Sequence, residues 1–440
     1  MSVTMLSILF FGAVLICLLM GLPLSFSLGG VSIIFLYFTW GPESFYMQVA
    51  LTWGNMNKFT LVAIPMFIFM AMIMEQAGMA NALYDAMYLW FGGLGGGLAV
   101  GTCVICAIFG AMCGVSGAAV VTMGTIALPS MLKYKYDKSL ALGCINAGGS
   151  WGILIPPSVT MILYCLLTGE SVGKMFAAGV MPGLLCLVMV SSYILIRCFF
   201  NPSLGPPIPE EERGNWKQKI ISLKSVILPI IVVLMVLGSI MGGVTTPTEA
   251  AAMGILGSLI SAKVYGQLKW PVVKEASIKT LRVSSMIMWI IFGAYSFSSA
   301  YDSMGAAELM KELMIHIPGG RWGAIIFMQA ILLFLGMLLD PAGIMMICLP
   351  VFLPVVEYYK FDTLWFGILF VMNMELGYMT PPFGFNLFYL KGIVPRGITM
   401  ADIYRSVIGY AAVQLAALIV IMIFPDIATW LAYKLLGGPS

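Results

Sequence analysis

Apolar stretches long enough to cross a membrane recur along the whole chain, and they decide what it can fold into. A helix needs about 20 residues to cross roughly 30 Å of hydrocarbon, and these stretches leave no room in 440 residues for a separate soluble domain. Only 9% of the residues are charged, against about 25% in soluble domains. The sequence therefore predicts one all-α, polytopic membrane domain whose first stretch, 5–22, is a retained helix.

Composition also argues against several classes of function. The net charge of +3 is small and lies in loops, so we expect no nucleic-acid partner. The nine cysteines include many in apolar segments, where a thiol behaves as a small hydrophobe, and Cys103 and Cys106 lack the further ligands of a zinc site. The single histidine, His316, lies outside the apolar segments, which leaves a membrane-embedded hydrolase without a base or metal ligand. We therefore predict a protein that is not an enzyme and holds no cofactor.

The chain contains an internal repeat, which is typical of transporters. A shift of 225 positions places residues of the first half on identical residues of the second, namely Pro129 on Pro354, Tyr134 on Tyr359, Lys135 on Lys360, Asp137 on Asp362, Gly152 on Gly377, Pro156 and Pro157 on Pro381 and Pro382, and Tyr164 on Tyr389. Shifts of 224 and 227 extend the match to most of the chain. The sequence thus predicts a first repeat at 1–200, a polar cytoplasmic linker at 201–224 and a second repeat at 225–440.

Each repeat has the same predicted order of segments. Three crossings, at 5–22, 24–40 and 60–77 and at 225–242, 245–262 and 283–301, precede a long apolar stretch, at 98–130 and 323–356. That stretch is interrupted at 114–117 and at 340–343, as in a re-entrant helical hairpin. Two further segments follow, at 139–165 and 176–196 and at 363–390 and 404–424. Five crossings per repeat place the two repeats in opposite orientations, so we predict an inverted pair.

The charges of the loops support this inversion. A periplasmic N-terminus places most of the 22 Lys and Arg residues in the cytoplasm, as positive charge in membrane proteins prefers. Both termini are then expected in the periplasm. The short charged segments 79–90 and 306–316 are predicted to lie along the membrane interface as braces.

Two broken helices are the first candidate site. Non-helical backbone is tolerated at membrane depth only where protein or a water-filled cavity supplies hydrogen-bond partners. In the segment 146–158, glycines loosen the helix, and Pro156 and Pro157 remove two donors and free carbonyl groups that suit a sodium ion. A simple kink is the alternative, but the repetition of the pattern at 373–384 favours a site.

The interrupted hairpins are the second candidate site. Ser116 offers a hydroxyl beside a helix N-terminus, which suits either a cation or an anionic head group. Asp340 is ionisable at membrane depth, although it could simply cap the helix that follows. Glu375 could pair with a cation or with a neighbouring hydroxyl. Asn386 could donate to a carboxylate or sulfonate, or bond to another helix.

Three motifs resemble one family: the stretches 148–158 (GGSWGILIPPS), 246–252 (TPTEAAA) and 380–388 (TPPFGFNLF). They resemble the large, DctM-type membrane subunit of tripartite ATP-independent periplasmic (TRAP) transporters, over essentially the full chain. The resemblance implies sodium-driven uptake of a small organic anion across the bacterial inner membrane. It also implies a periplasmic substrate-binding protein, a small four-helix (DctQ-type) membrane subunit and an elevator architecture. Scaffold helices would then occupy 1–97 and 225–322, and transport elements 98–200 and 323–440.

The resemblance also implies site residues. The implied sodium ligands are Ser116, Gly117, Asn146, Gly148, Gly149, Asp340, Gly343, Gly377, Thr380 and Pro381. Substrate contacts are expected at Ser116, Ser150, Pro156, Ser158 and Asn386. One departure is Ala118, which stands where the family often has a further serine. The sequence also lacks the phosphate-binding loop of an ATPase, so the energy is expected from a gradient.

Two other functions fit parts of this pattern. A stand-alone sodium and divalent-anion symporter shares the inverted hairpins but needs no binding protein. A passive structural subunit has no use for the paired broken helices. Since selectivity can reside in a partner, C4-dicarboxylates, keto or hydroxy acids and small sulfonates all remain candidate substrates.

Overall fold

A computed structural model describes residues 2–438, and in that range the chain forms helices and no strands. The first repeat contains α1 (Val3–Leu19), α2 (Leu24–Trp40), α3 (Glu43–Met56), α4 (Ala63–Gln76), α5 (Met79–Phe91), α6 (Gly97–Cys113), α7 (Ser116–Lys133), α8 (Lys138–Ser150), α9 (Val159–Thr168) and α10 (Val172–Phe200). The second contains α12 (Lys224–Met241), α13 (Pro247–Val264), α14 (Trp270–Ser303), α15 (Ala306–Ile315), α16 (Gly320–Gly336), α17 (Pro341–Tyr358), α18 (Thr363–Tyr378), α19 (Phe385–Ile393), α20 (Met400–Ile423) and α21 (Asp426–Leu436). The short α11 (Trp216–Ser222) lies between them.

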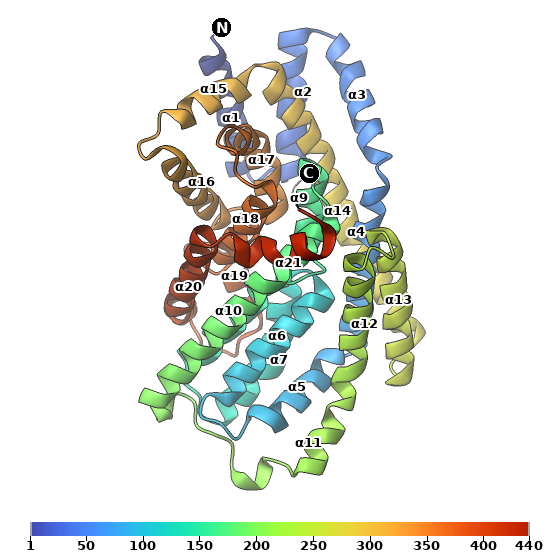
Figure 1. Ribbon diagram of the computed structural model, residues 1–440, viewed down its shortest axis with the longest axis vertical. Coiled ribbons are helices and arrows are strands. Elements are labelled where there is room, and N and C mark those ends of the chain that lie inside the picture. The colour runs from blue at the N-terminus through green and yellow to red at the C-terminus, as the bar shows by residue number, and fades with distance from the viewer. Residues whose placement is uncertain (1, 439–440) are drawn as a thin grey trace.

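The inverted repeat is confirmed. Hairpin 1, made of α6 and α7, and hairpin 2, made of α16 and α17, lie in opposite parts of the molecule, and the N-terminus and α11 mark opposite ends of its long axis (Figure 1). The second arms coincide under the shift of 225 positions, because α7 begins at Ser116 and α17 at Pro341. Even an unusual backbone conformation is repeated: Lys135 and Lys360 both have positive φ, at 59° and 52°.

The predicted crossing 60–77 matches the apolar segment Phe59–Gln76, whereas 283–301 covers only the last part of the much longer helix α14. A shift of 227 positions places 43–76, which holds α3 and α4, on the single helix α14. The short 3-10 helix Phe59–Val62 separates α3 from α4. The first part of α14 carries Lys274, Lys279 and Arg282. Because these charges lower the local hydropathy, the sequence placed the start of the crossing too late, although this part is also helical. The helix α21 was also not predicted.

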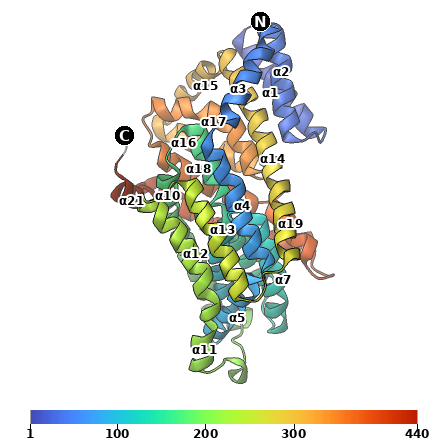
Figure 2. The same cartoon turned by 90° about the vertical axis from the view of Figure 1, so that its right-hand side faces the viewer.

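Two groups of helices interlock the repeats. In the first group, α2 packs on α14 and α4 packs on α13, and Figure 2 shows α4, α13 and α12 side by side. In the second group, α8 packs on α20, α7 on α19, and α10 on α18 and α20. These groups correspond in sequence to the predicted scaffold and transport elements, whose relative motion remains a prediction.

The helices make this a multi-pass membrane protein. Within the described residues, six segments are long and apolar enough to cross a membrane: Phe59–Gln76, Val172–Phe200, Trp216–Met241, Trp270–Ser303, Pro341–Tyr358 and Met400–Ile423. Large apolar side chains are exposed on these segments, such as Val188 and Leu234. Such a surface is suited to lipid tails rather than water.

Candidate functional site

The tip of hairpin 1 packs directly on the first broken helix. Gly114 ends α6 with a φ of +61°, and a Cβ at this residue would lie 2.9 Å from the carbonyl oxygen of Pro157. A Cβ on Gly152 would lie 3.1 Å from the carbonyl carbon of Val115. Glycine is required at such close backbone approaches. The hairpin tip and the broken helix therefore form one structural unit.

Hairpin 2 repeats this contact with the second broken helix. Gly336 at the end of α16 and Gly377 in α18 touch through their backbones, and a Cβ on Gly377 would lie 2.7 Å from the Cα of Gly336. The amide of Gly384 donates to the carbonyl oxygen of Met337 at 3.1 Å. Each hairpin is thus fastened to its own broken helix by a pair of glycines.

Ser116 and Asn386 join the two repeats at the tip of hairpin 1. The Ser116 hydroxyl donates to Oδ1 of Asn386 at 2.9 Å, and both side chains are buried. Nδ2 of Asn386 is buried with no hydrogen-bond partner among the described residues. The ring of Tyr389 covers Gly117, where a Cβ would lie 2.7 Å from the ring. Three predicted residues, Ser116, Gly117 and Asn386, therefore meet, and the amide nitrogen of Asn386 is a free donor at this point.

Asn146 provides a buried oxygen next to the first break. Its Nδ2 donates to the carbonyl oxygen of Leu142 at 3.1 Å, whereas Oδ1 accepts no hydrogen bond from the described residues. Gly148 and Gly149 have close packing contacts, because a Cβ on them would meet Cys106 at 2.8 Å and Val120 at 2.3 Å. These two glycines let α8 approach both arms of hairpin 1.

The predicted substrate residues Ser150, Pro156 and Ser158 have local partners. Ser158 donates to the carbonyl oxygen of Ile153 at 2.6 Å and caps α9, and Ser150 donates to that of Ala147 at 2.7 Å. Pro156 faces an apolar hollow between α6, α10 and α12. The structure therefore does not bring Pro156 to the contact between Ser116 and Asn386, although Ser158 lies near Gly114.

Asp340 caps α17, as the alternative interpretation proposed. Its Oδ2 accepts from the amide of Gly343 at 3.4 Å. Thr380 donates to the carbonyl oxygen of Leu376 at 2.6 Å, and Pro381 forms a cis peptide bond with Pro382, as Pro156 does with Pro157.

Sequence reasoning missed Gln414 and Tyr389. Gln414 on α20 donates from Nε2 to Oε1 of buried Glu375 at 2.5 Å and to Ser150 at 3.2 Å, while Oε2 of Glu375 has no partner among the described residues. No sequence pattern pointed to Gln414, which lies within the continuous, mostly apolar helix α20. Tyr389 had one, because the repeat places it on Tyr164.

The chain matches a family model described as "Tripartite ATP-independent periplasmic transporter, DctM component" over residues 11–427. The chain belongs to this family. It is 31% identical to the C4-dicarboxylate TRAP transporter large permease protein DctM of Vibrio cholerae, over 99% of each chain. It is 30% identical to the ectoine TRAP transporter large permease protein TeaC of Halomonas elongata, over 94% of this chain and 96% of that protein. These relatives of the DctM chain are transporter permeases and not enzymes.

Two further similarities concern length and fold. The isethionate TRAP transporter permease protein DctMQ of Oleidesulfovibrio alaskensis is 27% identical over 96% of this DctM chain but only 66% of its own length. Among solved structures, the YdaH transporter of Alcanivorax borkumensis has a TM-score of 0.58 at 13% identity, covering 92% of this chain and 91% of that chain. MtrF of Neisseria gonorrhoeae also has a TM-score of 0.58, at 12% identity, covering 90% and 85%. The fold is therefore that of a membrane transporter.

Proposed function

We propose that this DctM chain is a secondary active transporter that uses a sodium gradient to take up a small organic anion. The observation that carries the proposal is the contact between Ser116 and Asn386, where a hairpin tip meets a broken helix of the other repeat. It combines buried hydroxyl and amide oxygens, which suit sodium, with the free donor Nδ2 of Asn386, which suits an anion.

The sodium ligands are proposed around both hairpins. Oδ1 of Asn146 is buried and free to accept a cation, and the backbone near Gly117, Gly343 and Gly377 lies at the same tips and breaks. Asp340 would supply the one carboxylate of this set. No cofactor is proposed beyond the coupling ion.

The proposed substrate is a carboxylate or a sulfonate. Two of the similar proteins are named for C4-dicarboxylate and for isethionate, and a third for ectoine. An amide donor can bind either acidic group without a basic side chain. This leaves much of the selectivity to a binding protein.

The proposed partners are a periplasmic substrate-binding protein and a small four-helix membrane subunit. The relative named DctMQ, which is longer than this chain, supports the second partner. We place the chain in the bacterial inner membrane with both termini in the periplasm, because this orientation puts most Lys and Arg residues in the cytoplasm. The hairpins, α8–α10 and α18–α21 would move as an elevator against the scaffold helices α1–α4 and α12–α14.

Uptake into proteoliposomes tests the proposal. Vesicles holding this chain and its small subunit should accumulate a labelled dicarboxylate or sulfonate only with an inward sodium gradient and the binding protein. The comparison is made with potassium in place of sodium, and with the binding protein left out. Accumulation in potassium would contradict sodium coupling, and accumulation without the binding protein would favour the stand-alone symporter.

A further inference from the structure

The segment between the repeats is bound to the protein surface at several points and is not a free tether. The amide of Ile208 donates to Gly92 at 2.9 Å, the amide of Gly96 donates to Gly205 at 2.8 Å, and the amide of Asp137 donates to Leu204 at 2.9 Å. Ile208 is fully buried. The segment therefore bridges the end of α5, the start of α6 and the turn that follows α7. We name residues 201–213 the strap.

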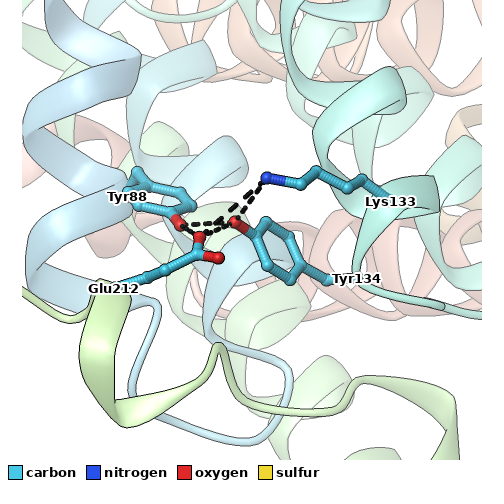
Figure 3. Close-up of polar contacts among 4 residues, drawn as sticks. All are labelled: Tyr88, Lys133, Tyr134 and Glu212. Carbon is cyan, nitrogen blue, oxygen red and sulfur yellow. Dashed lines mark hydrogen bonds and ion pairs between the residues drawn. The ribbon is translucent and has the colours of Figure 1, made fainter.

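Glu212 fastens the far end of the strap. Its carboxylate accepts hydrogen bonds from Tyr88 of α5, at 2.8 Å, and from Tyr134, the residue that follows α7 (Figure 3). The two hydroxyl oxygens lie 2.7 Å apart, and Nζ of Lys133 lies 4.0 Å from the carboxylate. One side chain thus holds α5 and hairpin 1 together.

In the second repeat, the segment that corresponds to the strap is not seen, among the described residues, to contact α15, the short helix that corresponds to α5. The shift of 225 positions places the strap on α21, whose Tyr433 donates to Asp362 in the turn after α17, as the strap binds the turn after α7. However, α21 packs on α10, α18 and α20, and it lies apart from α15 in both views (Figures 1 and 2). Of these two segments, only the strap is seen to bind the short helix that precedes the hairpin of its repeat.

We propose that the strap joins α5 to hairpin 1 as one rigid unit, so that the first repeat bends at the start of α5 and not between α5 and α6. This rests on the proposed elevator motion. The turn between α5 and α6 is held by the hydrogen bonds of Gly92 and Gly96. At the other end of α5, Gly78 has a φ of +69° and open space around its Cβ position, apart from Asn81 at 3.8 Å. Gly78 is therefore the joint.

Hydrogen exchange tests the fastening in the full chain, without any substrate. In Glu212→Gln, the amides of Ile208 and Asp137 should exchange several-fold faster than in the natural protein, since the variant loses the charged acceptor of two tyrosine hydroxyls. Glu211→Gln, one residue away and exposed, is the matched control and should leave both rates unchanged. Equal rates in Glu212→Gln and the natural protein would overturn the role of Glu212.

The same experiment has an expected pH dependence. Hydrogen bonds from Tyr134 and Tyr88 and the charge of Lys133 lower the pKa of Glu212 below its ordinary value of about 4.3. A lowered pKa means that the contribution is fully present above the ordinary value and is lost as the pH falls through the folded-state value. The difference in exchange rate between the natural protein and Glu212→Gln should therefore persist from about pH 5 to about pH 7, which lies above the ordinary glutamate pKa. It should vanish once the pH falls below the lowered pKa of Glu212.

A disulfide tests whether the strap stays attached during transport. A Cβ at residue 93 would lie 4.0 Å from Cγ of Arg213, so cysteines at Gly93 and Arg213 are within reach of a disulfide. The nine natural cysteines are buried or, for Cys17, half-buried. We expect the oxidised Gly93→Cys/Arg213→Cys variant to transport as fast as its reduced form and as each single variant. Arrest on oxidation, reversed by a reductant, would show that the strap must open and would overturn the proposal.

The two tests separate failure of the strap from failure of the proposed function. If the reduced double variant and the natural protein both show no uptake of any anion, the proposed function fails. The exchange rates of Ile208 and Asp137 still decide whether Glu212 fastens the strap.

Discussion

The Gly377→Ala variant should fold in reduced amount and lose transport. Its added methyl group would lie 2.7 Å from Cα, 2.8 Å from C and 3.0 Å from O of Gly336. All three atoms belong to the backbone, so no side chain can turn away, and overpacking of this kind costs about 1–3 kcal/mol or more. We expect the unfolding midpoint to fall by several degrees, measured by thermal unfolding in detergent.

Two matched variants provide the unfolding midpoints with which Gly377→Ala is compared. Gly152→Ala, at the equivalent position of the first repeat, would meet backbone at 3.1 Å and should lower the midpoint less. Gly30→Ala has nothing within 4 Å of the new methyl group and should leave the midpoint unchanged or slightly raised, since alanine favours a helix. If Gly377→Ala unfolds at the same temperature as Gly30→Ala, the close contact between α16 and α18 does not exist.

The Asn386→Ala variant should fold but lose roughly 10- to 100-fold in the uptake efficiency kcat/KM, where tenfold corresponds to about 1.4 kcal/mol. The substitution removes the acceptor of the buried Ser116 hydroxyl and the free donor Nδ2. Leaving a buried polar group without a partner costs about 1–3 kcal/mol. The measurement is sodium-driven uptake with the binding protein, over a range of substrate concentrations.

A second substitution separates a role in substrate binding from a role in sodium binding. Asn386→Asp adds a negative charge at the same place and shape, so it should reduce uptake of an anion more than Asn386→Ala does. If Asn386→Asp instead keeps uptake near the level of the natural protein and raises the affinity for sodium, Asn386 belongs to the cation site. A Ser277→Ala variant, at an exposed residue of α14, should behave as the natural protein.

The internal repeat made most of the architecture predictable from sequence. Because Gly152 and Gly377, and the two Pro-Pro pairs, recur at one spacing, both hairpins and both broken helices could be located. The tips at Gly114 and Asp340 lie where the interruptions predicted them. Glycine and proline act through the local backbone, and such effects can be read without knowing the tertiary structure.

Contacts between distant segments could not be predicted in the same way. Ser116 and Asn386 were each candidates, but nothing in the sequence paired residues 270 positions apart. The same holds for Gln414, whose neighbours Ser150 and Glu375 lie on two other elements. The strap was predicted only as a polar linker, because three of its hydrogen bonds run from backbone to backbone and leave no pattern of residue types, and nothing in the sequence paired Glu212 with Tyr88 and Tyr134.

The difference in continuity between α14 and its counterpart α3–α4 bears on how the protein adapts to bilayers of different thickness. At 1.5 Å per residue, the 34 residues of α14 extend about 51 Å, well beyond roughly 30 Å of hydrocarbon. A continuous helix adjusts to a thinner bilayer by tilting as a whole. The counterpart has the short 3-10 helix Phe59–Val62 between its two parts, so it can bend there and keep each part in its own orientation. The two repeats, although copies in sequence, should therefore respond to membrane thickness by different motions.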